Sequence, residues 1–277
     1  MIPRLIALDL DETLLDRESH LPPRNRAALD QAMAQGIEIA VATGRAFHTV
    51  PREILEFTGI RYVITGNGAA VYRTDGTAII RRVLPPEAAQ EALERTRGED
   101  VQYEVFVDGA AYAQADYLEG LETYMMDSHT CAYVRATRRP VEDIREFIRE
   151  NAHRMDSLAV IPRDMDTKAR VMNSLREIES VYITTSSVRL IEVNHRDCTK
   201  ASGLRFLAEL LAVPRELTAA FGNGDNDAEM LAWAGCGVAV AEGTELCRAS
   251  ADYVTGSYLE NGVAEAIRTL WGIAPME

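Results

Sequence analysis

Asp9 and Asp11 are the first residues in the chain whose types and spacing could do chemistry. They follow an apolar run, Leu5 to Leu8, that is typical of a buried strand. Residues i and i+2 of an extended segment point the same way, so both carboxylates can face one point beyond the strand. A cation such as Mg²⁺ between them would relieve their repulsion. One carboxylate could then attack phosphorus while the other handles a proton, although an isolated Asp-x-Asp pair is more often a solvated turn.

Thr43 and Lys200 are two further candidates for binding an anion. Thr43 follows a second apolar run, Ile37 to Ala42, and its hydroxyl and the backbone turn at Gly44 could donate hydrogen bonds to a phosphate. Lys200 stands at the start of a predicted helix, where a cation is unfavourable unless an anion is bound there too. In isolation, the first pattern equally fits a strand-to-helix turn, and the second fits a solvated surface lysine.

The segment from Gly222 to Asp227 gathers two acids and two amides after a third apolar run, Thr218 to Phe221. Such a segment fits a glycine-rich turn with a helix cap as well as it fits a metal site. The four signals gain weight together because each lies at the end of a predicted parallel strand or at a helix start nearby. The carboxyl ends of parallel strands meet at one edge of a sheet, where ligands bind.

The elements that position these residues alternate between strand and helix in the first and last thirds of the chain. This alternation predicts an α/β fold with a doubly wound, mostly parallel, Rossmann-like sheet. The expected strands cover residues 5–8, 37–42, 62–65, 218–221 and 238–241, and the expected helices cover residues 22–35, 46–58, 199–211 and 260–270.

The middle of the chain has no acidic or glycine motif at a strand end, and it opens on Pro85-Pro86. We interpret residues 85–189 as a second α/β domain inserted into a core formed by residues 1–84 and 190–277. Its candidate strands are 101–107, 158–161 and 181–185, and its candidate helices are 86–97, 141–153 and 164–178.

The amino-acid composition limits the classes of partner and the cellular compartment that we expect for this protein. A formal charge of −14 disfavours nucleic acid and anionic membranes as partners, so we expect neither. The four cysteines form no CxxC pair, which indicates reduced thiols in a cytoplasmic protein. We find no signal peptide and no apolar run near 20 residues, and the oligomeric state is not readable.

The four signals, in this order, resemble the motifs of the haloacid dehalogenase superfamily, specifically its Cof-type phosphatases. DLDETLL resembles the first motif, VATGR the second, Lys200 the third and FGNGDNDAEML the fourth. The stretch ITGNGAAVYRTDG also resembles a segment of the Cof group. The insertion falls between the second and third motifs, where this group carries its cap, so the resemblance covers the whole chain.

The resemblance implies a magnesium-dependent phosphatase that hydrolyses small phosphorylated metabolites through an aspartyl-phosphate. Asp9 would be the nucleophile, Asp11 the general acid and then base, and Thr43 and Lys200 would hold the phosphate. Mg²⁺ would bridge Asp9, the Asp11 carbonyl, a side chain of the fourth motif and the phosphate. The residues that complete the implied site are Gly44, Arg45, Asn67 and Asn226 toward the substrate, and Asn223 and Asp227 toward the metal.

Two positions depart from the family pattern. Glu12 stands where glycine is more common, and we expect little effect on chemistry. Asn223 stands where an aspartate usually binds magnesium, so the metal site carries one negative charge fewer. Asp225 or Asp227 could compensate, directly or through water.

Two other functions fit the same motifs. A phosphomutase shares the aspartyl-phosphate and returns the phosphoryl group to its substrate. A non-catalytic sensor of phosphorylated metabolites would be favoured by Asn223 alone and disfavoured by intact Asp9, Asp11, Thr43 and Lys200. The substrate itself is not readable: sugar phosphates, phosphorylated cofactors and nucleotides all fit.

Overall fold

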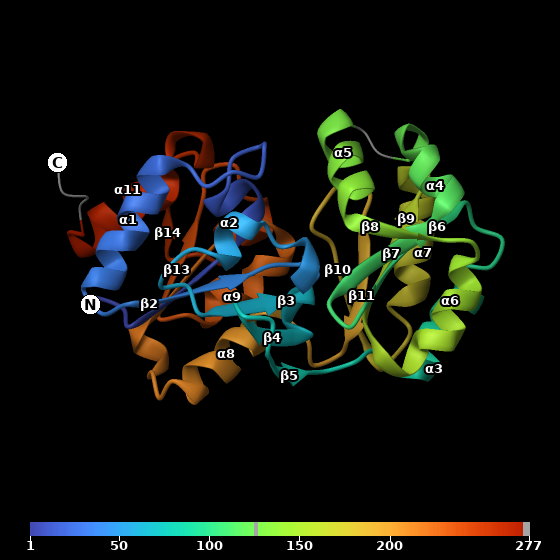
Figure 1. Ribbon diagram of the computed structural model, residues 1–277, viewed down its shortest axis with the longest axis horizontal. Coiled ribbons are helices and arrows are strands. Elements are labelled where there is room, and N and C mark those ends of the chain that lie inside the picture. The colour runs from blue at the N-terminus through green and yellow to red at the C-terminus, as the bar shows by residue number, and fades with distance from the viewer. Residues whose placement is uncertain (125–126, 274–277) are drawn as a thin grey trace. The chain divides into compact units, whose positions relative to one another are not determined.

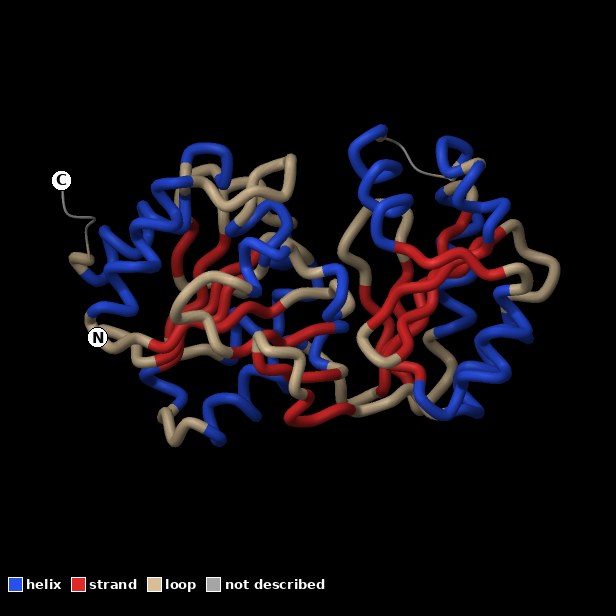
Figure 2. The backbone as a smooth tube through the Cα atoms, viewed as in Figure 1, coloured by secondary structure: helices blue, strands red, loops and turns tan. Residues whose placement is uncertain are grey.

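The computed structural model describes residues 1–124 and 127–273. The chain forms two compact units, each built on its own β-sheet with helices packed against it (Figures 1 and 2). The first unit comprises residues 1–44, 50–80 and 199–277, and the second comprises residues 45–49 and 81–198.

The first unit contains an eight-stranded sheet in the order β14-β13-β12-β1-β2-β3-β4-β5. The strands from β14 through β3 are parallel, and β4 runs antiparallel to β3. This agrees with the predicted mostly parallel sheet. The strands are β1 (Leu5–Leu8), β2 (Glu38–Ala42), β3 (Tyr62–Thr65), β4 (Ala70–Arg73), β5 (Ala78–Arg81), β12 (Thr218–Gly222), β13 (Cys236–Ala239) and β14 (Tyr253–Val254).

Helices cover both faces of this sheet, which is why its central strands are apolar without interruption. Successive residues of β1 point to opposite faces: Ile6 and Leu8 enter one apolar cluster, whereas Leu5 and Ala7 enter another. The first cluster includes side chains of α1 and α11, and the second includes side chains of α8 and α9. The helices of this unit are α1 (Pro23–Ala34), α2 (Arg52–Leu55), α8 (Lys200–Leu210), α9 (Ala228–Trp233), α10 (Glu245–Ala249) and α11 (Gly262–Trp271).

The second unit contains a separate six-stranded sheet in the order β10-β11-β9-β6-β7-β8. Its main apolar cluster joins side chains of α3, α6 and α7 to β6, β9 and β11, so these three helices share a face. Its strands are β6 (Val101–Val107), β7 (Ala110–Gln114), β8 (Arg138–Val141), β9 (Met155–Pro162), β10 (Val181–Thr184) and β11 (Ile191–His195), and its helices are α3 (Pro86–Arg95), α4 (Ala115–Glu119), α5 (Ser128–Thr137), α6 (Ile144–Asn151) and α7 (Met165–Leu175).

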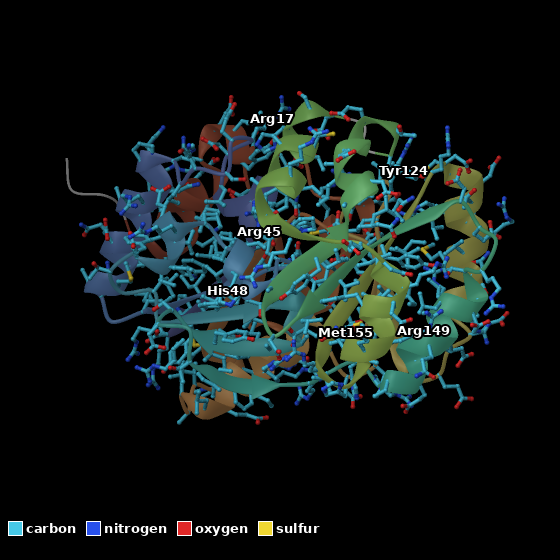
Figure 3. All side chains as sticks on the ribbon, turned by 45° about the vertical axis from the view of Figure 1, so that its right-hand side comes forward. Arg17, Arg45, His48, Tyr124, Arg149 and Met155 are labelled. Atoms are coloured by element: carbon cyan, nitrogen blue, oxygen red, sulfur yellow. The ribbon has the colours of Figure 1, made fainter. Side chains whose placement is uncertain are left out.

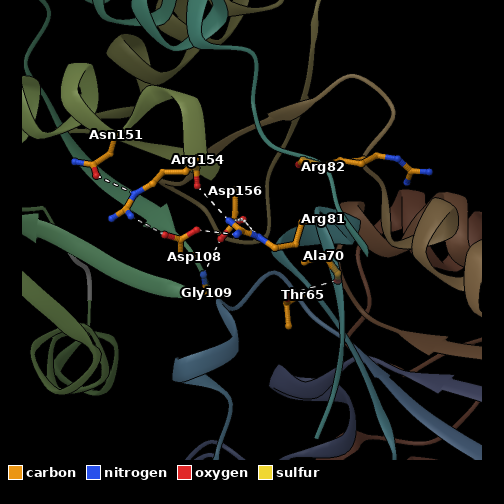
Figure 4. A network of polar contacts seen from close by, with 10 residues as sticks. Thr65, Ala70, Arg81, Arg82, Asp108, Gly109, Asn151, Arg154 and Asp156 are labelled. Atoms are coloured by element: carbon orange, nitrogen blue, oxygen red, sulfur yellow. Dashed lines mark hydrogen bonds and ion pairs between the residues drawn. The ribbon is translucent and has the colours of Figure 1, made fainter. Parts of the chain in front are cut away.

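The limits of the second unit lie at 80/81 and 198/199, whereas we expected 84/85 and 189/190 from the sequence. Arg81 is held within the second unit, because its guanidinium contacts Asp156 Oδ1 at 2.6 Å and Asp108 Oδ1 at 2.7 Å (Figure 4). At the other limit, β11 pairs with β9 and β10 of the second sheet. This pairing carries the second unit past residue 190.

The helix expected over residues 46–58 does not form. Residues 47–49 make one 3₁₀ turn, and the short α2 begins only after Pro51. A proline has no N–H to donate to a preceding turn and also restricts the residue before it, so a continuous helix cannot pass through this point. Residues 45–49 instead pack with the second unit.

Candidate functional site

Four of the predicted motifs lie at one edge of the main sheet of the first unit. Because β12, β1, β2 and β3 are adjacent and parallel, the residues that follow them lie at the same edge. Asp9 follows β1, Thr43 follows β2, the turn Gly66–Gly68 follows β3, and the segment 223–227 follows β12.

Lys200 links two of these motifs through a pair of short ionic contacts. Its Nζ lies 2.7 Å from Asp9 Oδ1 and 2.7 Å from Asp227 Oδ1. All three side chains are buried. Burial alone would lower the pKa of Lys200, but the charges of Asp227 and Asp9 outweigh it and raise the pKa. The two carboxylates therefore favour the charged form of Lys200.

Asp9 lies where negative charge is in excess. Burial raises the pKa of Asp9 from 3.8 to about 7; the attraction of Lys200 opposes this shift, and repulsion from Asp227 and Asp11 adds to it. Two carboxylates thus contact one lysine, and a third, Asp11, adds to the negative charge around Asp9. A further cation at this place would restore the ionised form of Asp9, which is the form able to act as a nucleophile.

Asp227 uses both carboxylate oxygens within the protein. Oδ1 contacts Lys200, and Oδ2 accepts hydrogen bonds from the backbone N–H groups of Asn223 at 3.0 Å and Gly224 at 2.9 Å. Gly222 makes this approach possible, because a Cβ there would lie 2.4 Å from the Asp227 side chain. Asp227 therefore fixes both the lysine and the loop that presents Asn223.

Asn226 and Asn67 form a second buried contact at the same edge. Asn226 Nδ2 donates to Asn67 Oδ1 at 3.0 Å, although the two residues are 159 positions apart. Asn67 adopts a left-handed backbone with φ of 53°. Gly68 is also left-handed, and a Cβ on it would lie 2.1 Å from the Thr199 carbonyl oxygen. The turn after β3 is thus packed directly against the start of the helix that carries Lys200.

The remaining predicted residues have different environments. Thr43 is buried, and its carbonyl accepts a hydrogen bond from the Asn67 N–H at 3.1 Å. Gly44 lies in the first unit with Thr43, whereas Arg45 belongs to the second. Asp11 is exposed and Asn223 is half-buried.

Two residues that support the site were not singled out from the sequence. Thr244 donates from Oγ1 to Asp225 Oδ1 at 2.7 Å, and its N–H donates to the Asn223 carbonyl at 2.8 Å. Thr199 caps α8 by accepting from the Ser202 N–H at 3.1 Å. Each is a threonine directly before a helix, so helix-cap preference is the signal that could have found them.

The first motif forms an irregular turn in which Glu12 adopts an unusual backbone conformation. Asp11 keeps an extended backbone, but Glu12 adopts the left-handed region with φ of 56° and ψ of 23°. Glycine adopts this conformation without strain, which explains why glycine suits the position. The turn keeps that conformation here with a glutamate in place.

The carboxylates at this edge are ligands that a cation such as magnesium could use. Within residues 1–124 and 127–273, no group of three or more His, Cys, Asp and Glu side chains is arranged to hold a metal ion. Magnesium is commonly bound through one or two carboxylates together with waters and substrate phosphate. The excess negative charge around Asp9 is the feature that fits a divalent cation.

Comparison with known proteins identifies the family. The family model described as haloacid dehalogenase-like hydrolase matches residues 6–267. The chain belongs to this family. The resemblance and the enzyme class, a hydrolase of this family, are therefore confirmed, and so is the predicted fold of a core with an inserted α/β unit.

Relatives of this haloacid dehalogenase-like hydrolase match along nearly its whole length. Phosphatase YwpJ of Bacillus subtilis is 30% identical, over 96% of this chain and 99% of the relative. The 5-amino-6-(5-phospho-D-ribitylamino)uracil phosphatase YcsE of the same organism is 28% identical, over 96% and 94%. A solved structure of a haloacid dehalogenase-like hydrolase from B. subtilis has a TM-score of 0.85 and 29% identity, over 96% of this chain and 99% of that one.

Proposed function

We propose that this haloacid dehalogenase-like hydrolase is a magnesium-dependent phosphatase of small phosphorylated metabolites that works through an aspartyl-phosphate on Asp9. The observation that carries the proposal is the buried contact of Lys200 with both Asp9 and Asp227 at the edge where parallel strands end. A carboxylate beside a fixed cation, at the place where α/β sheets bind ligands, suits attack on a phosphate.

The proposed reaction has two displacements at phosphorus. A carboxylate oxygen of Asp9 forms a bond to phosphorus as the bond to the leaving oxygen breaks, and that oxygen takes a proton from Asp11. Asp11 then removes a proton from water as the water attacks the phosphorus, which frees Asp9 and releases inorganic phosphate. Lys200 and Thr43 hold the phosphate oxygens, and Lys200 offsets their charge in the transition state.

Magnesium, when bound, would offset the charge shared by Asp9 and the phosphate. The residues proposed to hold it are Asp9, the backbone carbonyl of Asp11, and Asn223. Asp227 was included among the metal residues from its place in the fourth motif. Because both of its oxygens already accept hydrogen bonds, we propose that it acts by fixing Lys200 and the Asn223 loop.

The substrate class rests on the relatives. YcsE is named a phosphatase of 5-amino-6-(5-phospho-D-ribitylamino)uracil, and an HMP-PP phosphatase of Klebsiella pneumoniae is 27% identical over 84% of this chain. We therefore propose a phosphorylated cofactor precursor or a sugar phosphate. Gly44, Arg45, Asn67 and Asn226 are the proposed substrate contacts.

We also propose a reducing compartment, the cytoplasm, because all four cysteines are free thiols. No helix among the described residues has the length and apolar character needed to cross a membrane.

The test is a screen of phosphorylated metabolites for release of inorganic phosphate in the presence of Mg²⁺. Asp9→Asn should lower turnover by roughly three or more orders of magnitude, because the nucleophile is lost. Asp30→Asn, at an exposed position on α1, is the matched control and should be active. Isomerisation without phosphate release would indicate a mutase, and binding without turnover would indicate a sensor.

A further inference from the structure

The loop formed by residues 223–227 is held by the turn that follows β13. The pairing of β12 with β13 continues past the ends of the two strands, because the Val240 N–H donates to the Gly222 carbonyl at 3.2 Å. Further along, the Thr244 N–H donates to the Asn223 carbonyl at 2.8 Å. All of these residues belong to the first unit. The backbone of Asn223 is therefore fixed on this side by Thr244.

The side chain of Thr244 makes two further hydrogen bonds. Its hydroxyl donates to Asp225 Oδ1 at 2.7 Å and accepts from the Cys247 N–H at 3.1 Å. The first bond reaches the middle of the loop, and the second caps α10. Thr244 thus contacts the loop at two points, Asn223 through its backbone and Asp225 through its hydroxyl.

The turn that carries Thr244 is itself held by α10. Arg248 donates from Nη1 to the Gly243 carbonyl at 2.7 Å and to the Ala241 carbonyl at 3.2 Å. The Gly243 N–H donates to the Val240 carbonyl at 3.0 Å, which closes the turn. Thr244 therefore contacts the loop from a fixed support.

A second set of contacts joins this turn to the segment after the first motif. Glu242 Oε2 accepts from the Tyr258 N–H at 3.3 Å, and the Tyr258 hydroxyl accepts from Arg17 Nε at 3.1 Å. Arg17, labelled in Figure 3, follows Asp9 by eight residues in the chain. The turn after β13 is thus connected to the segments that follow both β12 and β1.

We propose that Thr244 is a positioning residue that fixes the loop 223–227, so that the Asn223 side chain is held in place to bind magnesium. The proposal rests on the proposed function, in which Asn223 is a metal ligand. An amide has no net charge to attract a cation, so its contribution depends on where its oxygen is held. A loop that must be ordered when a ligand binds weakens the binding, and the contacts of Thr244 order this loop beforehand.

The first experiment compares wild type, Thr244→Val and Thr244→Ser. The readouts, both without substrate, are the dissociation constant of Mg²⁺ by calorimetry and the hydrogen-exchange rates of the Asn223 and Gly224 amides by NMR. Thr244→Val keeps the size of the side chain and loses the hydroxyl. It should raise the Mg²⁺ dissociation constant by about 3- to 10-fold and speed the exchange of both amides. Thr244→Ser keeps the hydroxyl and should restore most of the binding.

Thr218→Val is the matched control. Thr218 Oγ1 donates to the Arg215 carbonyl at 2.6 Å and accepts from the Gly235 N–H at 3.1 Å, so this variant also loses one donated and one accepted hydrogen bond. Thr218 is the first residue of β12, whereas the loop follows the last. The Mg²⁺ dissociation constant and the exchange of the Gly224 amide should match those of wild type.

Two variants of Asp225 separate the contact with Thr244 from the charge. Asp225→Asn loses the charge but keeps an acceptor for the Thr244 hydroxyl, whereas Asp225→Ala loses both. Asp225→Ala should therefore weaken Mg²⁺ binding more than Asp225→Asn does. Adding Thr244→Val to Asp225→Ala should bring little further loss, because the contact is already gone.

Three results would overturn the role of Thr244: wild-type Mg²⁺ binding in Thr244→Val, an equal loss in Thr218→Val, or equal Mg²⁺ affinity in the two Asp225 variants. A wild-type protein that binds no Mg²⁺ would overturn both this role and the proposed metal dependence. If Mg²⁺ binding follows the expectations but no phosphate is released from any substrate, the role of Thr244 is supported and only the phosphatase function is wrong.

Discussion

Lys200 Nζ and Asp9 Oδ1 lie 2.7 Å apart, and the lysine side chain is only 1% exposed. A buried ion pair depends on the attraction between its two groups, because desolvation disfavours the charged form of each. Here Asp227 is the second partner, and its oxygens also fix the loop after β12. The same carboxylate of Asp227 therefore holds both the lysine and the loop after β12.

The first prediction concerns Lys200→Met. It leaves two buried carboxylates without their cation, so we expect a loss of about 3–5 kcal/mol in the free energy of unfolding together with loss of activity. Urea denaturation at neutral pH measures the first effect. The control is Lys168→Met, because Lys168 is the other lysine of the chain, is also buried, and donates to Thr185 Oγ1 and to carbonyl oxygens. Equal losses in the two variants would contradict a special role for the carboxylates.

The second prediction concerns Asp9 and pH. Because the pKa of Asp9 is about 7 in the folded protein, against an ordinary 3.8, the folded state binds more protons than the unfolded state between these values. The contribution of Asp9 to stability is thus present at low pH and is lost as pH rises toward 7. In EDTA, wild type should lose up to about 2 kcal/mol more than Asp9→Asn between pH 5.5 and pH 8. Parallel stability curves for the two proteins would refute this.

The third prediction concerns Asn223. Asn223→Asp adds a charge to the proposed metal site, so the magnesium concentration for half-maximal activity should fall. Asp225→Asn tests whether Asp225 already supplies the charge; since Asp225 accepts a hydrogen bond from Thr244, we expect a smaller change in metal dependence. The measurement is a magnesium titration of phosphate release for the three proteins. An unchanged requirement in Asn223→Asp with a large loss in Asp225→Asn would transfer the ligand role to Asp225.

The fourth prediction concerns Glu12, whose backbone is left-handed. Glu12→Gly relieves the strain but makes the unfolded chain freer, so the net effect on unfolding should lie between zero and about 1 kcal/mol of stabilisation. Glu12→Val should destabilise, because a β-branched residue tolerates this conformation poorly. Thermal denaturation of both variants measures these changes in stability. A Glu12→Gly variant less stable than wild type would contradict backbone strain at Glu12.

Residues that follow strands were predictable because strand ends are fixed by local apolar runs. Leu5 to Leu8 is such a run, and it places Asp9 at the edge of the sheet without further information. Lys200 was predictable for a different reason: its position at a helix start conflicts with the helix dipole, and a conflict of this kind indicates a bound anion or a carboxylate. Its contacts with Asp9 and Asp227 satisfy that requirement.

Features that depend on contacts distant in sequence were not predictable. The contact between Asn67 and Asn226 joins two glycine-rich turns, and nothing in either turn specifies the other. Strand β11 was missed although its pattern is local: Ile191 and Val193, which enter the apolar cluster of the second unit, alternate with polar Glu192 and Asn194, and such alternation is itself a strand signal. Pro51 was the overlooked signal that ends the helix expected from residue 46.

The discontinuity of the second unit has a consequence for protein engineering. Arg45–Thr49 packs with residues 81–198, so the insertion and this short segment form one structural module encoded in two pieces. A chimaera that grafts a relative's insertion at residues 81 and 198 alone would place foreign side chains against Ala46 and His48. Crossover points chosen on both sides of residues 45–49 as well would transfer the module whole and leave Thr43 and Gly44 with their own sheet.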